Sequence, residues 1–388
     1  MACGSDDPEC EGGTLPPVSG ECTPEGSCPA IAVSGDAPAT TAGSFKGFAD
    51  PALQADPAVP GRVWLAYSWP FVATGQTTTG ETVYMGAVES HLARSEDGGA
   101  TFSFVRGLYA APAVLDPEGS GETGIASSET VSLAVITSGP LTTWYAAHLR
   151  YFLQPADGYN PRYATSWTVR VGAAASPEAL GDPAALSREV VIGVSTTAAV
   201  YGASVEVDRL AGLPIERCAM LNNPTLFAHG GTLYLIVECL AFVGADLDFA
   251  NATTQILATT PSGDPRTWVW RHVGTLADHS LAQQLGADTI RQPEVSEAGD
   301  GTLLLIVTPA RADDTAQTGT VGEGCAAIEL ASIDPPVIRR DCAGNAVVRA
   351  RLTGDTMGSC AYDPASVTGL MPHRQQMPWV LYASGLRP

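Results

Sequence analysis

The sequence predicts an all-β fold, a five-bladed β-propeller closed by its N-terminal strand. Short apolar runs bounded by Gly, Pro, Asp and Asn recur along the chain, whereas long helical periodicity is almost absent. This pattern is typical of a repeated β architecture. Five similar segments are spaced by 79, 94, 69 and 71 residues: ADPAL at Asp50, SETVSL at Glu129, NNPTLF at Asn223, RQPEV at Gln292 and YDPAS at Asp363.

Each repeat is expected to form a four-stranded blade. A turn and a second apolar strand follow every first segment, as in RVWLAYSW and TLYLIVECL. Third strands that end in small residues with Asp or Pro follow in the first four repeats, and the last repeat reaches Pro388 without one. Because AIAVSGDAP at 30–38 has the same form, we expect the N-terminal strand to complete the last blade, which would protect the sheet edges.

The motif SEDGGATF lies between the third and fourth strands expected for the first blade. It matches the Asp-box pattern of sialidase-type propellers. Asp97 is expected to accept hydrogen bonds from the backbone of the turn, and Phe102 to pack inward. The motif therefore predicts structure rather than activity, through Ser95, Asp97, Gly99 and Phe102.

Composition restricts the class of partner. The chain has 388 residues, 45% of them hydrophobic, and its formal net charge is −21 with Lys46 as the single lysine. A phosphate backbone would need a basic patch, so nucleic acid is not expected as a partner. No run approaches the roughly 20 apolar residues of a membrane span. We expect a monomer with no cofactor, apart from the open case of a structural ion in the channel.

The nine cysteines favour an exported, disulfide-containing protein that is secreted or held at the cell surface. The start MACGSDDPEC is similar to the cleavage region of a bacterial lipoprotein, with Cys3 as the lipid anchor, and an arbitrary start is the alternative. Residues 1–28 are predicted to be a tether or cap, and 29–388 the propeller. Turns flanked by cysteines predict the disulfides Cys218–Cys239 and Cys325–Cys342, while the pairing of Cys10, Cys22, Cys28 and Cys360 stays open. Metal-ligand spacing such as Cys-x2-Cys is absent from the sequence.

The aligned first-strand positions are all polar in strands that are otherwise apolar. They are Asp50, Glu129, Asn223, Gln292 and Asp363. Innermost strands line the central channel of a propeller, so these side chains are expected to face one another. They would either line a water-filled channel or hold a sugar.

The ADPAL and VWLAYS pairing, the third-strand endings and the five repeats resemble the five-bladed arabinanase and xylosidase type of glycosidase over roughly 30–388. The resemblance implies that Asp50 is a general base and Glu129 a second acid that tunes its pKa. This sequence departs from the family pattern at the third position, where the family has a glutamate as general acid and this chain has Asn223. An amide cannot protonate a leaving oxygen. Glu294 or Glu216 is the expected substitute, with Arg150, Arg291, Asn223, Gln292 and Asp363 as substrate contacts.

Two other functions fit the same residues. A glycan-binding or scaffold lipoprotein would use the polar ring without a competent acid. A sialidase-like hydrolase would need several arginines and a tyrosine paired with an acid, for which Arg217, Arg291 and Tyr362 beside Asp363 are available. Strand alternation directs Arg291 and Tyr362 away from the face of Gln292 and Asp363, which places this alternative below the first.

Overall fold

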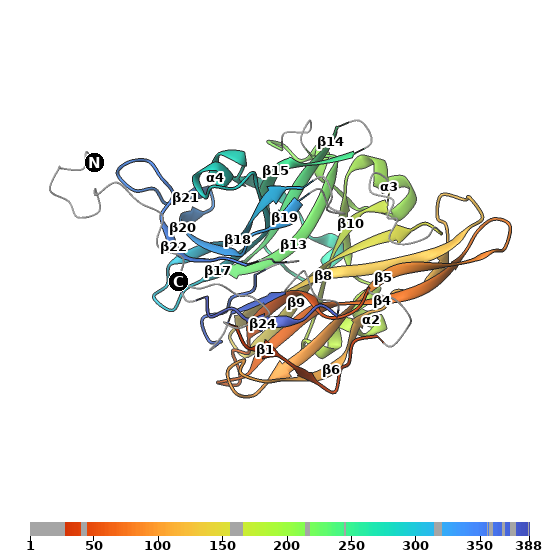
Figure 1. The fold of residues 1–388 in the computed structure, drawn as a ribbon, viewed down its shortest axis with the longest axis horizontal. Coiled ribbons are helices and arrows are strands. Elements are labelled where there is room, and N and C mark those ends of the chain that lie inside the picture. The colour runs from red at the N-terminus through yellow and green to blue at the C-terminus, as the bar shows by residue number, and fades with distance from the viewer. Residues whose placement is uncertain are drawn as a thin grey trace.

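A computed structural model gives the fold in Figure 1. The residues that it describes are 28–39, 45–155, 166–213, 218–243, 246–313, 320–354, 356, 360–366, 369–372, 378–386 and 388. The expectations for Cys3, Cys10, Cys22, Glu216 and Arg217 lie outside these residues, as does most of the predicted tether.

The largest sheet has eleven strands in two consecutive antiparallel groups. β3, β4, β5 and β6 pair in that order, as do β8, β9, β10 and β11, and Gln76 pairs with Thr123 where the groups meet. The short strands β2, β7 and β12 are added to β6, β8 and β11. The bounds are β2 (Val33–Ser34), β3 (Ala49–Ala55), β4 (Val63–Gln76), β5 (Thr82–Ser95), β6 (Phe102–Tyr109), β7 (Ala113–Leu115), β8 (Thr123–Ser138), β9 (Leu141–Leu153), β10 (Thr168–Ala174), β11 (Val190–Gly193) and β12 (Val205–Glu206).

Three further sheets follow along the chain. One has the order β13-β14-β15-β16, the next β17-β18-β20-β21 with β19 and β22 at its sides, and the last β1-β24-β23. The bounds are β13 (Met220–His229), β14 (Thr232–Val243), β15 (Asp246–Thr259), β16 (Arg271–Ala277), β17 (Thr289–Glu297), β18 (Leu303–Ala312), β19 (Thr320–Gly322), β20 (Cys325–Ile333), β21 (Pro336–Ile338), β22 (Val348–Leu352), β23 (Leu370–Pro372), β24 (Leu381–Ala383) and β1 (Ala30–Ile31). β1 pairs antiparallel with β24, so segments from the two ends of the described chain lie side by side (Figure 1).

The α-helices of the described part are short and lie in connections between strands: α2 (Pro183–Leu186), α3 (Ser195–Tyr201) and α4 (His279–Gln284). Single 3-10 turns occur at Glu178–Gly181, Val207–Arg209 and Pro265–Thr267. In α4 the side chain of Asp278 caps the first turn by accepting from the Ser280 amide at 2.9 Å. Within the described residues, none of the helices has the length and apolar character needed to cross a bilayer.

Both faces of the strands in the first group are buried. In β4, Val63, Trp64 and Leu65 are all at most 2% exposed, although successive side chains of a strand point to opposite faces. Leu65 clusters with Leu381 near the C-terminus, whereas Trp64 clusters with residues of β8 and β9 such as Trp144. The first group is therefore packed between the last sheet and the second group.

The first strands of the four leading groups surround one cavity. β3, β8, β13 and β17 contribute to its wall, and residues 362–365 complete it. The cavity has a volume of about 250 Å³. Five chain segments spaced along the sequence thus line a common space.

Each of these four strands contains a bulge just before it reaches the cavity. The pairing register breaks between Ala49 and Ala52, Glu129 and Ser132, Asn222 and Thr225, and Arg291 and Glu294. The bulged residue has left-handed backbone, with φ of 44° at Asp50, 52° at Thr130, 44° at Asn223 and 53° at Gln292. Bulges redirect side chains and often lie next to functional sites.

Two sequence alignments need correction. In β8 the residue at the bulge is Thr130, so the expected alignment of Glu129 with Asp50 is wrong by one position. The fifth segment is not a strand at Asp363. There the chain turns, since Ser366 N donates to Asp363 O at 2.9 Å and Ala365 N donates to the Asp363 carboxylate at 2.8 Å. Asp363 hence belongs to a turn beside the cavity.

One expected disulfide is confirmed and one is wrong. Cys218 is bonded to Cys239 with their Cα atoms 4.8 Å apart. Cys325 is bonded to Cys360, not to Cys342, across a Cα separation of 6.0 Å. The hairpin of β20 and β21 ends at Ile338, and β22 then places Leu352 opposite Cys325. Cys342 therefore lies away from Cys325, and it is bonded elsewhere, as is Cys28.

Candidate functional site

Two carboxyl groups meet where the bulges of β3 and β8 adjoin. Asp50 and Glu129 are both half-buried. The Ser68 hydroxyl of β4 donates to the Asp50 carboxylate and accepts from the Thr130 amide at 3.0 Å, so it connects the two bulges. The Tyr151 hydroxyl of β9 donates to Glu129. Asp50 and Glu129 are thus brought together as the sequence predicted.

The surroundings separate the pKa values of this pair. Burial raises the pKa of Asp50 from 3.8 to about 6, against the opposing effects of the Ser68 hydrogen bond and the positive charge of Arg291. Burial and the negative charge of Asp50 together raise the pKa of Glu129 from 4.5 to about 8. Near pH 7 Asp50 is therefore mainly ionised and Glu129 mainly protonated, which is the state required of a base and an acid.

A buried ion pair from the third and fourth groups adjoins Asp50. Arg291 Nε donates to Glu238 Oε1 at 3.2 Å, and Asn222 Nδ2 donates to the other oxygen of Glu238 at 3.2 Å. The amide of Gln292 also donates to Glu238. Glu238 is 1% exposed and has partners for both oxygens. It therefore fixes Arg291, whose positive charge favours the ionised form of Asp50, while the negative charge of Glu238 has a smaller opposing effect.

Sequence reasoning missed Glu238. Its signal is a single carboxylate in TLYLIVECL, where every other side chain except the first is apolar or sulfur-containing. A lone acid on a buried strand requires a partner, so it could have been flagged as half of an ion pair. Ser68 and Tyr151 carried no comparable signal, because isolated hydroxyls in strands are common.

Two polar groups at the bulges of β8 and β13 have no hydrogen-bond partner among the described residues. Thr130 Oγ1 and Asn223 Nδ2 are buried and make no hydrogen bond among the described residues. Their residues are 8% and 6% exposed and occupy the bulges of β8 and β13. Leaving such groups unpaired costs about 1–3 kcal/mol each. A ligand that offers hydroxyl groups would satisfy them.

Glu294, the predicted substitute acid, and Asp363, the fifth predicted ring residue, lie beside the cavity. Glu294 accepts from the Tyr362 amide at 3.4 Å through one oxygen, while its other oxygen has no hydrogen bond among the described residues. Burial raises the pKa of Glu294 well above its ordinary value. Asp363 accepts from the Ala55 amide at 2.7 Å. Neither carboxylate belongs to the Asp50 and Glu129 cluster.

Arg291 and Arg150, which the sequence predicts as substrate contacts, both make hydrogen bonds within the protein. Arg291 is already held by Glu238 and by Thr320, to which it donates at 2.8 Å, and its guanidinium lies over the Phe249 ring. It is therefore not free to bind the carboxylate that a sialidase-like site would hold. Arg150 donates to Ala110 O and to Ser128 Oγ, both at 2.7 Å, on the side of β8 and β9 that faces the first group.

The turn with the SEDGGATF sequence has the expected contacts. Asp97 accepts from the Thr101 amide at 2.9 Å and from the Ser95 hydroxyl at 2.7 Å, and Ser95 accepts from the Gly99 amide at 2.8 Å. Phe102 is 1% exposed. These bonds hold the turn between β5 and β6, away from the carboxyl pair.

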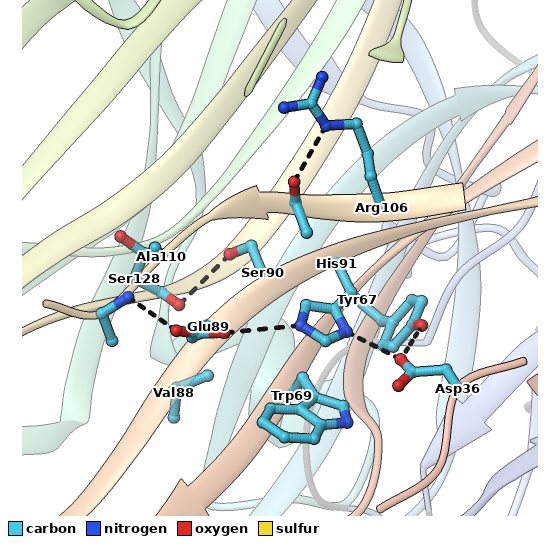
Figure 2. Close-up of polar contacts among 12 residues, drawn as sticks. Asp36, Tyr67, Trp69, Val88, Glu89, Ser90, His91, Arg106, Ala110 and Ser128 are labelled. Atoms are coloured by element: carbon cyan, nitrogen blue, oxygen red, sulfur yellow. Dashed lines mark hydrogen bonds and ion pairs between the residues drawn. The ribbon is translucent and has the colours of Figure 1, made fainter. Parts of the chain in front are cut away.

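A second charged network joins the N-terminal segment to β4 and β5. Figure 2 shows the His91 ring between Asp36 and Glu89. Nδ1 of His91 is 2.8 Å from Asp36, its Nε2 is 3.7 Å from Glu89, and the Tyr67 hydroxyl also donates to Asp36. Trp69 stacks on the imidazole at 4.9 Å. The hydrogen bonds to the two carboxylates outweigh burial, so the pKa of His91 is raised. No group of three or more His, Cys, Asp or Glu side chains in the described part could hold a metal ion.

Comparisons with known proteins identify the fold. No family model matches the sequence, and no curated protein matches it. A family 117 glycoside hydrolase from the marine bacterium Zobellia galactanivorans superposes with a TM-score of 0.50 at 12% identity, over 92% of this chain and 90% of that one. An arabinoxylan arabinofuranohydrolase of family 43 from Bacillus subtilis gives 0.46 at 14% identity, over 87% and 59%. A Bombyx mori family 32 β-fructofuranosidase gives 0.45 at 9%, also over 87% and 59%. The family 117 glycoside hydrolase is a β-propeller protein, and its TM-score over nine-tenths of both chains shows that this mostly β chain shares the β-propeller fold.

Proposed function

We propose that the protein is a carbohydrate-active propeller and hydrolyses a glycosidic bond, with Asp50 as base and Glu129 as acid. The observation that carries the proposal is the half-buried pair itself, two carboxyl groups on neighbouring inner strands with pKa values of about 6 and about 8. Environments that separate the pKa values of two carboxyl groups are typical of acid–base catalysis. The unpaired Thr130 and Asn223 groups beside the pair suit the hydroxyls of a sugar.

The proposed reaction uses each carboxyl group once. Glu129 donates its proton to the glycosidic oxygen as the bond from that oxygen to the anomeric carbon breaks. Asp50 accepts a proton from a water molecule whose oxygen bonds to the same carbon. Asp50 then carries a proton and Glu129 a negative charge, and exchange with solvent restores the starting state. Arg291 favours the ionised form of Asp50 that the first step requires.

The test is a screen of aryl glycosides and of plant and microbial polysaccharides with the wild type, Asp50→Asn and Glu129→Gln. Asparagine is suited to the left-handed backbone of position 50, because Asn223 has the same φ of 44° in β13. Each variant should lose about 10²–10⁴-fold in kcat. Glu81→Gln is the control, since Glu81 is an exposed acid in the turn between β4 and β5 that does not line the cavity, and it should leave the rate unchanged. Full activity in both Asp50→Asn and Glu129→Gln would contradict the proposal.

A glycan-binding protein without turnover is the second candidate. It is favoured by Asn223, an amide where the family pattern has its third acid. Sugar binding by the wild type with no released product, and with affinity unchanged in Glu129→Gln, would favour this function over hydrolysis.

We further infer five blades, with β1 completing the last one against β24, and an Asp-box role for the turn at Ser95. The five segments around the cavity and the pairing of Ile31 with Leu381 support this arrangement. The Cys218–Cys239 and Cys325–Cys360 disulfides support a secreted or cell-surface location. Lipidation at Cys3 is proposed from the sequence alone, and mass spectrometry of the protein from its native membrane fraction would detect it. The monomeric state, also a proposal, is testable by light scattering.

A further inference from the structure

Two arginines lie on one face of the second group of strands. The pairing of β9 with β10 places Arg150 opposite Thr168 and His148 opposite Arg170. Arg150 and Arg170 are therefore diagonal neighbours on the same face, at a spacing of roughly 7–8 Å between their backbones. Both side chains are half-buried. This face lies against the end of β6, where Tyr109 stacks on His148 at 3.7 Å.

The negative charge at this place does not balance the two arginines. Glu189 is the acid that acts on both guanidinium groups among the described residues. Its carboxylate also lies 3.1 Å from His148 Nε2 and is almost fully buried. Burial and the nearby charge of Arg170 lower the pKa of Arg150 to about 10. One carboxylate thus faces two half-buried cations.

The arginines also have unused hydrogen-bond donors. The Arg170 side chain makes no hydrogen bond or ion pair within the described part of the chain, and its Nε is fully buried. Arg150 uses only Nη1, toward Ala110 and Ser128. Tyr109 adds a buried hydroxyl with no partner. Several other arginines of this acidic protein are paired with carboxylates, as Arg106 and Arg349 are with Asp182 and Glu329, although Arg188 and Arg340 bond to uncharged oxygens. An unpaired cation in a partly buried place is unfavourable unless an anion joins it.

We propose that Arg150 and Arg170 form a binding site for an oxyanion, the carboxylate or sulfate group of an acidic sugar. Planar guanidinium groups hold such anions through paired hydrogen bonds. Arg150 contacts Ser128, the residue before Glu129, so the site lies on the opposite face of β8 from the candidate acid. That the anion belongs to a sugar rests on the proposed function, and it implies that the substrate is an acidic glycan. That an oxyanion binds here rests on the two arginines alone.

Isothermal titration with sodium sulfate, sodium glucuronate and glucose at constant ionic strength tests the proposal. The wild type should bind sulfate and glucuronate saturably and glucose not at this site. Arg170→Met should bind both anions at least tenfold more weakly. It is expected to fold, because Arg170 makes no hydrogen bond among the described residues, and its melting temperature without anion should exceed that of the wild type. Arg209→Met removes an arginine that is 71% exposed and paired with Glu206, and it should bind like the wild type.

The outcomes separate the two proposals. Equal anion binding by Arg170→Met and the wild type, or no saturable binding by the wild type, would overturn the site. Sulfate binding that depends on Arg170, in a protein that neither cleaves nor binds any glycan, would retain the site and reject the proposed function. If sulfate binds through Arg170 but glucuronate does not, and only neutral glycans are cleaved, then the acidic-sugar source is wrong.

Discussion

Replacing Asp50 with asparagine should lower the pKa of Glu129. The negative charge of Asp50 opposes ionisation of Glu129, whose pKa in the wild type is about 8. Burial is the larger cause of the raised pKa and persists in the variant. The pKa should therefore fall without reaching its ordinary value of 4.5.

The size of the decrease follows from the charge interaction. For a separation of about 6 Å, at the outer end of the range over which a neighbouring charge strongly shifts a pKa, and an effective dielectric constant of about 20, two like charges repel by about 3 kcal/mol. That corresponds to about 2 pKa units, at 1.36 kcal/mol for each unit. Because burial contributes more than Asp50 does, we expect a decrease of about 1 to 2 units, to a pKa of roughly 6 to 7.

The assay is a pH titration of side-chain carboxyl ¹³C shifts, with the Glu129 resonance identified by its loss in Glu129→Gln. Glu297→Gln serves as control, because that exposed acid is not among the groups that raise the pKa of Glu129. An unchanged Glu129 pKa in Asp50→Asn would refute the reasoning, since it would mean that the two carboxyl groups do not interact. No substrate is required, so the result is independent of the proposed reaction.

Three further predictions concern single side chains. Tyr151→Phe removes a donor that favours ionised Glu129, so it should raise the pKa of Glu129 by about 1 unit in the same titration. The hydrogen bonds that raise the pKa of His91 stabilise the protein fully below the unfolded-state pKa. This stabilisation is lost as the pH rises through the folded-state pKa. Hydrogen-exchange protection factors at residues 33–39, which correct for the base-catalysed intrinsic rate, should therefore fall from pH 6 to pH 9, and His91→Gln should remove that fall. Glu294 has a raised pKa and an unpartnered oxygen, so its burial costs stability as the pH rises above the unfolded-state value. Glu294→Gln should raise the free energy of unfolding, measured with urea, by about 1–3 kcal/mol at pH 8 and by little at pH 4. A lower free energy of unfolding at pH 8 would contradict this.

Strand positions were predictable because apolar runs and turn residues are local signals. The segments at Asp50, Asn223 and Gln292 coincide with β3, β13 and β17, since an X-Pro step marks each bulge. The segment at Glu129 lacks proline, which is why the alignment missed Thr130 by one residue. At Asp363 the X-Pro step belongs to a turn, and local sequence does not separate a turn from a bulge.

The site was only partly predictable because its contacts join residues far apart in sequence. Asp50 and Glu129 were found as polar residues on inner strands. Their partners Ser68, Tyr151 and Glu238 come from second strands, and only the folded sheets bring them close. The Arg150 and Arg170 pair depends on the register of β9 with β10, which apolar periodicity alone does not fix.

Backbone strain distinguishes one end of the channel from the other. Left-handed backbone is tolerated by Asp and Asn but is unusual for the β-branched Thr130 and for Gln292. Strain of this kind costs about 1–3 kcal/mol per residue and persists where the surrounding structure enforces it. All four strained residues lie at the end with Asp50 and Glu129, whereas the end with Glu294 and Asp363 has none among the described residues. Since backbone strain clusters at active and binding sites, this distribution supports the proposed site at the Asp50 end.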